Sequence, residues 1–383
     1  MALQPLSFDS TLAAYRQQAA ALLLAQQDGQ HWAIELFHQN HPRFLDEKVV
    51  WLPKRISDDE IQAAALSQDD AELAIARWYN FRDWAALSEW VHAMADRDSA
   101  VFHFESAVEA VIAGDLDRLR VLLEKHPELI QARSTRVTNF DPPIHRATLL
   151  HYLGANGVES YRQKSPANAV EVARLLLEAG AEPDAVADMY GGHCTTMSML
   201  VSSTPPAESG VQQGLIHTLV DFGTSVEAQG EGAWTSPLVT ALVFGFENAA
   251  ETLVQRGARV DQLPVAAGLG RIEDLKRLLP AAGVEERHRA LALAAQLGKV
   301  EIVKLLLDAG EDPNRYNPAH LHSHATPLHQ AALAGHFAVV ALLVDRGAQL
   351  DLKDKLWQAT PLGWAQHGGK TEVAGYLSRH GAS

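Results

Sequence analysis

Three histidines alternate with other residues in the last quarter of the chain, at His320, His322 and His324. Successive side chains of an extended strand point to opposite sides, so an extended segment would place all three imidazoles on one side. Three histidines on one face can bind zinc or iron and leave one coordination position for water. We expect no bound cofactor, and keep a metal at this segment as the alternative. Otherwise the imidazoles of a polar loop bond to backbone or solvent.

Other residues that could bind a ligand lie on similar polar stretches between apolar, helix-forming segments. Histidines and aromatic residues together suit a site that stacks on a ligand and moves protons. The candidate catalytic residues are His322, His324, His193 and Asp188. The candidate binding residues are Asp141, His145, Tyr190, His193, Trp234, His320, His322, His324 and Trp357. The sequence contains no phosphate-binding glycine loop, no serine elbow motif and no metalloprotease signature, so it names no reaction.

Paired short helices must position these polar stretches, and residues 325–354 show the pattern most clearly: ATPLHQAALAGHFAVVALLVDRGAQLDLKD. Pro327 suits the first position of a helix, and Gly335 ends that helix. A second apolar face at Val339, Val340 and Leu343 follows, and Gly347 ends the second helix. A unit this small cannot bury its own apolar faces, so it must stack on copies of itself.

This unit resembles the ankyrin repeat, in which two helices and an extended finger carry a TPLH signature. The resemblance implies an all-α solenoid of about eight repeats with β-hairpin-like fingers. It also implies a binding scaffold, because most ankyrin arrays bind other molecules. The family uses the histidine of TPLH to tie down the finger backbone. We therefore expect structural roles for His151 and His329, which stand at that place.

Residues 1–98 differ from the repeats and are expected to form a helical cap, leaving 99–383 as the ankyrin-repeat domain. We expect helices over 12–26, 31–37 and 61–66, the last opened by a capping box at Ser57 and Glu60. Two more helices fill 69–94 and meet at 79–83. This segment looks like the helical leader of a broad group of poorly characterised bacterial ankyrin proteins. Solenoids need such caps at their ends.

The spacing between repeats is irregular. Insertions fall at 157–168 and 203–213, whereas the fingers before the fifth and sixth repeats are missing, at 257–261 and 283–289. Two missing fingers would open a gap on the order of 20 Å, since packed helices lie 8–10 Å apart. Fingers 224–235 and 311–325 would flank this gap, and the longer one could fold inward as a lid. We expect Trp234 and the three histidines to converge there.

Composition narrows the class of partner. The net charge is −15, with 47 acidic and 32 basic residues, so we expect neither nucleic acid nor an anionic membrane as partner. The single cysteine, Cys194, excludes an intramolecular disulfide and fits a reducing compartment, so we expect a cytoplasmic protein. We expect recognition of a protein partner through the concave face and fingers. The alternative is an enzyme or small-molecule-binding protein with a His/Trp-lined pocket where the fingers are missing.

Overall fold

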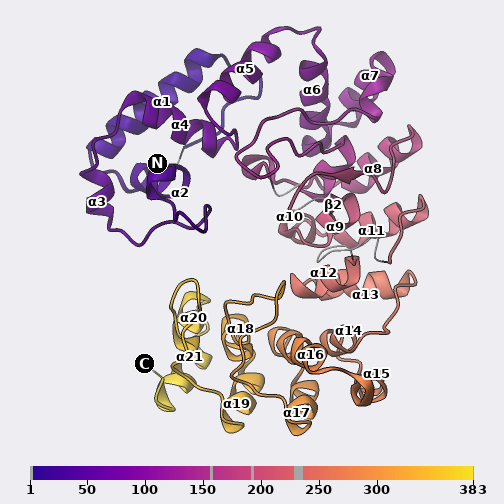
Figure 1. Cartoon of the computed structure of the whole chain (residues 1–383). Coiled ribbons are helices and arrows are strands. Elements are labelled where there is room, and N and C mark those ends of the chain that lie inside the picture. Colours follow the sequence, from indigo (N-terminus) through magenta and orange to yellow (C-terminus); the bar gives the residue numbers. More distant parts are fainter. Residues whose placement is uncertain (1–2, 156–157, 191–193, 228–235, 383) are drawn as a thin grey trace. The chain divides into compact units, whose positions relative to one another are not determined.

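The computed structural model describes residues 3–155, 158–190, 194–227 and 236–382. The described chain is mostly helical, and its helices follow one another in short pairs (Figure 1). The chain divides into two compact units, Met1–Thr224 and Ser225–Ser383, which we call unit 1 and unit 2. The expected domain boundary at 98/99 lies inside unit 1 and stays a prediction. None of the described helices is long and apolar enough to cross a membrane.

The N-terminal part of unit 1 is a small helical bundle. Its elements are α1 (Leu12–Gln27), α2 (His31–Asn40), η1 (Pro42–Phe44), α3 (Asp58–Gln62), α4 (Gln68–Trp78) and α5 (Trp84–Ala95). The capping box of Ser57 and Glu60 is confirmed. The expected helix over 61–66 is wrong in its end, because α3 stops at Gln62. There the side-chain amide of Gln26 donates to the carbonyl oxygens of Ile61 and Gln62, each at 2.8 Å.

The remainder of unit 1 contains longer connections. Its elements are α6 (Ala100–Ala113), α7 (Leu116–Lys125), η2 (Pro127–Ile130), η3 (Leu149–Gly154), η4 (Ser160–Arg162), α8 (Ala169–Glu178), β1 (Val186–Ala187), β2 (Cys194–Thr195), α9 (Thr196–Leu200), α10 (Thr204–Glu208) and α11 (Gln212–Asp221). Strands β1 and β2 pair antiparallel, with Val186 opposite Thr195, and form one of the expected hairpin-like fingers. The two expected insertions contain η4 and α10.

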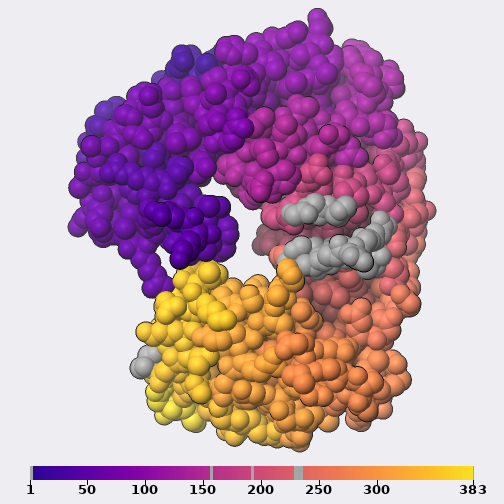
Figure 2. All heavy atoms as spheres, viewed as in Figure 1, coloured from indigo at the N-terminus to yellow at the C-terminus, as the bar shows by residue number. Residues whose placement is uncertain are grey.

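Unit 2 consists of helix pairs that contact their neighbours along the chain. In the space-filling view, its described residues are coloured orange to yellow (Figure 2). Its elements are α12 (Pro237–Val243), α13 (Glu247–Gln255), α14 (Leu263–Gly268), α15 (Ile272–Leu278), η5 (Leu279–Ala281), α16 (Val284–Gln296), α17 (Val300–Asp308), α18 (Pro327–Ala334), α19 (Phe337–Asp345), α20 (Pro361–His367) and α21 (Thr371–Arg379). Helices α14, α16, α18 and α20 pack in one row, and α15, α17, α19 and α21 pack in a second.

The glycine and core positions of unit 2 follow the repeat pattern. Gly335 ends α18 with φ +83°, where a side chain would be strained, and an added Cβ would lie 2.8 Å from Lys370. Leu306 and Leu343 are fully buried between repeats. Leu305 and Leu342, the residues just before them, are only half-buried and pack against the same core.

The two missing fingers of unit 2 are replaced differently. Between α13 and α14 only residues 256–262 connect the helices, and we call this segment the short link. At the second place, α16 begins at Val284, so residues expected to connect two repeats form an additional helical turn. Residues 309–326, by contrast, form a long connection between α17 and α18.

Candidate functional site

The histidine-rich finger 311–325 is a series of turns rather than an extended strand, so the expected alternation of side chains is wrong. His320 and His322 have φ values of +64° and +55°, in the left-handed region that strands do not use. The amide of Leu321 donates to the carbonyl of Pro318, and that of Ala325 donates to the carbonyl of His322. Leu321 is buried beneath these turns, and its burial favours the compact conformation over a strand.

This finger folds against the N-terminal half of α16. The carbonyl of Tyr316 lies 3.0 Å from Nε2 of His288, and Arg289 donates from Nη1 to the carbonyl of Ala319 at 3.1 Å. Arg287 pairs with the buried Glu311 at 2.8 Å. The additional turn of α16 therefore supplies the groups that hold the finger. Its movement as a lid stays a prediction.

The three histidines of this finger have different surroundings. The ring of His324 lies 5.0 Å from Trp357 and 5.7 Å from Trp364, and its Nε2 is buried without a hydrogen-bond partner. Burial lowers the pKa of His324, which favours its neutral form. His320 and His322 are exposed. Loss of hydration lowers the pKa of His322, and a hydrogen bond to the backbone of Val243 opposes this shift. In the described part of the chain, no group of three His, Cys, Asp or Glu is placed to hold a metal ion. The metal stays a prediction.

The neighbouring finger presents Trp357 to solvent. The buried carboxylate of Asp354 accepts hydrogen bonds from the amides of Leu356, Trp357 and Ala359 and from the indole Nε1 of Trp364, at 2.5–3.1 Å. Burial alone would raise the pKa of Asp354, but these donors outweigh it and lower the pKa. The ionised carboxylate therefore fixes the turn that leaves Trp357 46% exposed.

The structural roles expected for His151 and His329 are confirmed. Both rings are buried, and each Nδ1 lies within 3.3 Å of the amide of the threonine three residues earlier. Nε2 of His151 lies 3.1 Å from the carbonyl of Cys194, and Nε2 of His329 lies 3.2 Å from that of Ala359. Each histidine thus joins the start of its own helix to the finger that follows.

Two adjacent fingers of unit 1 carry an exposed apolar cluster. The rings of Phe140 and Tyr190 meet edge to face at 6.2 Å, and the amide of Asp188 donates to the carbonyl of His145 at 2.7 Å. Four large apolar side chains here are 38–48% exposed, and we call them the finger patch: Phe140, Ile144, Val186 and Tyr190. Three of the four, Phe140, Ile144 and Val186, were missed by sequence reasoning, because isolated apolar residues on a finger give no periodic signal.

The remaining candidate residues are scattered. Asp141 is exposed. Asp188 is half-buried and forms an ion pair with Arg146 at 3.8 Å. His145, expected to contact a ligand, is instead fully buried, because its Nε2 bonds to Glu159 at 3.0 Å. His193 and Trp234 lie outside the described residues. The predicted convergence of Trp234 with the histidines therefore stays a prediction.

A buried cluster of charged side chains in unit 1 was not predicted. Glu159, in the insertion 157–168, pairs with Arg136 at 3.0 Å and with Arg162 at 2.9 Å, and Arg162 also pairs with Glu105 at 2.6 Å. Burial would raise the pKa of Glu159, but the two guanidinium groups outweigh it and hold the pKa well below its ordinary value. Completely buried ion pairs of this kind are costly to break, because a lone charge would remain.

This cluster anchors the N-terminal bundle. The guanidinium of Arg136 donates to the carbonyl of Tyr79 at 3.3 Å and lies 4.1 Å from the centre of the Phe81 ring. The amide of Ser160 donates to Oδ1 of Asn80 at 2.8 Å. The turn between α4 and α5 is therefore held by Arg136 and Ser160, and the role of residues 1–98 as a cap stays a prediction.

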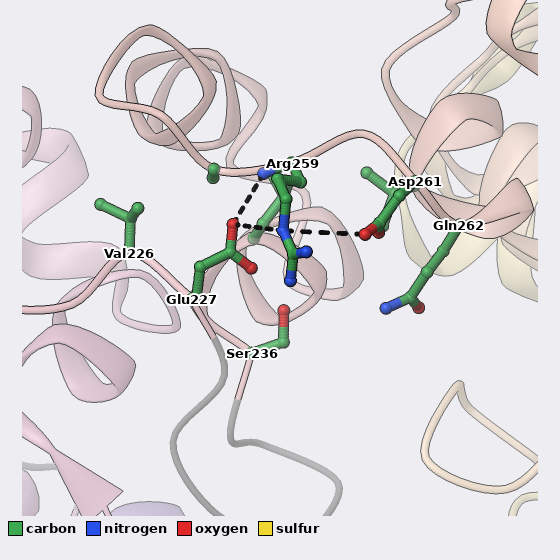
Figure 3. Close-up of a pocket in the computed structure, with 9 residues that line it drawn as sticks. Val226, Glu227, Ser236, Arg259, Asp261 and Gln262 are labelled. Atoms are coloured by element: carbon green, nitrogen blue, oxygen red, sulfur yellow. Dashed lines mark hydrogen bonds and ion pairs between the residues drawn. The ribbon is translucent and has the colours of Figure 1, made fainter.

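A pocket of about 140 Å³ lies at the short link of unit 2 (Figure 3). Its described lining comprises Val226, Glu227, Ser236, Leu238, Ala258, Arg259, Asp261, Gln262 and Val265. This set contains no histidine, so the hypothesis of a His-lined pocket finds no support among the described lining residues. The position of the pocket agrees with the first of the two missing fingers.

The thiol of Cys194 is unsuited to nucleophilic chemistry. It is buried and lies 3.0 Å from the carbonyl of Met189. Burial raises the pKa of the thiol to about 11, which keeps it protonated near neutral pH.

Comparisons with known proteins identify the repeat. A family model described as ankyrin repeats (3 copies) matches residues 263–354 and 291–383. The chain is 34% identical over 125 residues to human cyclin-dependent kinase 4 inhibitor B, covering 32% of this chain and 88% of that protein. It is 28% identical over 225 residues to the ankyrin repeat and KH domain-containing protein mask-1 of Caenorhabditis elegans, covering 55% of this chain. Mouse ankyrin repeat and SAM domain-containing protein 6 is 40% identical over 74 residues, 19% of this chain.

The extent of these matches differs between the relatives. The chain spans 8% of the length of mask-1 and 8% of the mouse protein. The human inhibitor is matched over 88% of its length at 34% identity. The chain belongs to the ankyrin-repeat family.

Proposed function

We propose that this protein is an interaction scaffold that recognises a protein partner through its concave face and fingers. The finger patch carries this proposal, because exposed aromatic and aliphatic side chains gathered on one surface are typical of protein interaction sites. In unit 2 the exposed Trp357, fixed by Asp354, adds a second aromatic anchor. The human relative is named as an inhibitor of a kinase, and such action on another protein supports the same class of function.

The finer architecture belongs to this proposal. We infer about eight repeats stacked as a solenoid, with the N-terminal bundle as their cap, in a cytoplasmic protein of the bacterial group that the sequence resembles. Hydrogen bonds from Arg136 and to Asn80 support the cap. The acidic net charge supports a partner other than nucleic acid or an anionic membrane.

A small molecule as the main ligand has less support. Pockets for drug-sized ligands and cofactors enclose roughly 300–1,000 Å³. The pocket at the short link encloses about 140 Å³, and none of its described lining residues is a histidine or an aromatic residue. We therefore prefer a protein partner over the alternative of an enzyme with a His/Trp-lined pocket.

The proposal is tested by changing the finger patch. The double variant Phe140→Ser and Tyr190→Ser removes the two exposed rings without touching buried residues. Tagged wild-type and variant proteins are used to capture partners from cells of the native source, with quantification by mass spectrometry. The matched control is Val121→Ser, which alters an exposed apolar residue on α7.

We expect a set of proteins that wild type and the control retain and that the double variant loses. Circular dichroism and melting temperature should stay unchanged in both variants. Retention of the same proteins by the double variant would remove the finger patch from the interaction surface.

A further inference from the structure

We propose that the pocket at the short link receives a lysine or arginine side chain of the bound partner. This inference rests on the proposed function, since it assumes a protein partner, and it specifies the chemistry of one contact. The described lining comes from α12, α14, the short link and the residues Val226, Glu227 and Ser236, at the place of the first missing finger. Every residue considered belongs to unit 2.

The size of the pocket fits one side chain. A volume of about 140 Å³ is too small for a nucleotide or a drug-sized ligand, which need several hundred Å³. Three buried apolar residues, Leu238, Ala258 and Val265, contribute to the lining. Lysine and arginine combine a long aliphatic stem with a charged end, so their stems suit an apolar wall below a polar rim.

The charges at the rim favour a cation. Oε1 of Glu227 accepts hydrogen bonds from the backbone amide of Arg259 at 3.0 Å and from its Nε at 3.2 Å. Oδ2 of Asp261 lies 3.7 Å from the same Nε (Figure 3). Two carboxylates thus flank one guanidinium, which leaves an excess negative charge at the rim. A partner carboxylate would be repelled by both acids, and the whole chain has a net charge of −15.

Both carboxylates remain reachable by a partner. The side chains of Glu227 and Asp261 are 41% and 53% exposed, and that of Arg259 is 71% exposed. Each carboxylate has a second oxygen besides the one that faces Arg259, and Gln262 and Ser236 supply further acceptors. A partner ammonium or guanidinium joins this rim, or displaces the exposed Arg259 from it.

Methyl NMR spectra of the full chain test this inference. The probes are end-blocked glycine pentapeptides whose central residue is lysine, arginine, norleucine or glutamate. The methyl signals of Val226, Leu238 and Val265 report occupation of the pocket, and those of the distant core residue Leu343 report the fold. We expect the lysine and arginine peptides to shift the three pocket signals, and the norleucine and glutamate peptides to leave them in place.

Charge variants decide between a cationic and an anionic occupant. The double variant Glu227→Gln and Asp261→Asn should weaken binding of the lysine peptide about fivefold or more, because both anionic partners are lost. Arg259→Gln removes the competing cation and should strengthen binding of the lysine peptide. Glu273→Gln, at an exposed carboxylate paired with Lys276, is the matched control and should change nothing.

Three results would overturn the inference: no shift with the basic peptides, equal shifts with norleucine, or binding of the glutamate peptide that Arg259→Gln abolishes. None of these results bears on the capture experiment at the finger patch. The proposed function and this inference can therefore fail separately.

Discussion

Acid should destabilise unit 1 through the buried His151. Its ring is fully buried, with Nδ1 facing Thr148 and Nε2 bonded to the carbonyl of Cys194. Burial lowers the pKa of His151 to about 4, and the hydrogen bonds to backbone oppose this only in part. In the unfolded chain a histidine has a pKa near its ordinary value of about 6.5. As pH falls, the unfolded chain therefore binds the proton first.

The size of the effect follows from the two pKa values. Stability from this group is complete above about pH 6.5 and is lost as pH falls towards 4. A difference of about 2.5 pKa units corresponds to a total loss of about 3 kcal/mol, because one unit equals about 1.4 kcal/mol. Between pH 7 and pH 5 the free energy of unfolding should fall by about 2 kcal/mol through His151 alone.

The variant His151→Asn isolates this contribution, because other buried histidines act equally in both proteins. Urea unfolding is measured at pH 7 and pH 5, and hydrogen exchange of peptides from 1–224 reports unit 1 separately. At pH 7 the variant should lose about 1–2 kcal/mol, since a buried hydrogen bond is removed. Between pH 7 and pH 5 it should lose about 2 kcal/mol less than wild type. The control is His92→Asn, at an exposed position. Equal pH dependence in wild type and His151→Asn would refute the reasoning.

Three further predictions concern stability. In urea unfolding, Leu343→Ala should lower the free energy of unfolding by about 2–5 kcal/mol, because Leu343 is fully buried. Leu342→Ala should lower it clearly less, because Leu342 is half-buried. Equal losses would show that the repeat register is wrong. Deletion of residues 1–98 should cause aggregation or a lower melting temperature, because Arg136 and its apolar neighbours lose their cover. A fragment that is monomeric in size-exclusion chromatography and melts at the wild-type temperature would contradict the cap. Arg136→Gln should lower the free energy of unfolding by about 3–5 kcal/mol, because Glu159 is left buried without this partner. Adding Glu159→Gln should lower it by less than the sum of the two single changes, because both variants remove the same ion pair. Additive changes in a double-mutant cycle would argue against direct coupling.

Local patterns in the sequence predicted local structure well. The capping box at Ser57, the helix end at Gly335 and the TPLH role of His329 each depend on residues close in sequence. The missing finger at the short link was also predictable, because the distance between repeat landmarks is a count along the chain. These features need no knowledge of distant contacts.

Features that depend on distant residues could not be predicted. The prediction of an extended strand for the histidine-rich finger was wrong, because burial of Leu321 and hydrogen bonds to α16 favour a series of turns. His145 was assigned to a surface because its partner, Glu159, lies in an insertion that gives no periodic signal. The sequence predicts missing fingers near this pocket, but its rim of Glu227 and Asp261 depends on how the short link folds.

The anchoring of the N-terminal bundle has a consequence for the order of folding. The bond from Arg136 to Tyr79 spans 57 residues, and that from Ser160 to Asn80 spans 80. In unit 2 the helix pairs contact mainly their immediate neighbours, so each can form as soon as the next is made. Contacts between distant residues slow folding, because a long loop must close first. During synthesis, these contacts to the bundle cannot form until residue 160 has left the ribosome. Until then, the surface of the bundle that they cover stays exposed and open to aggregation.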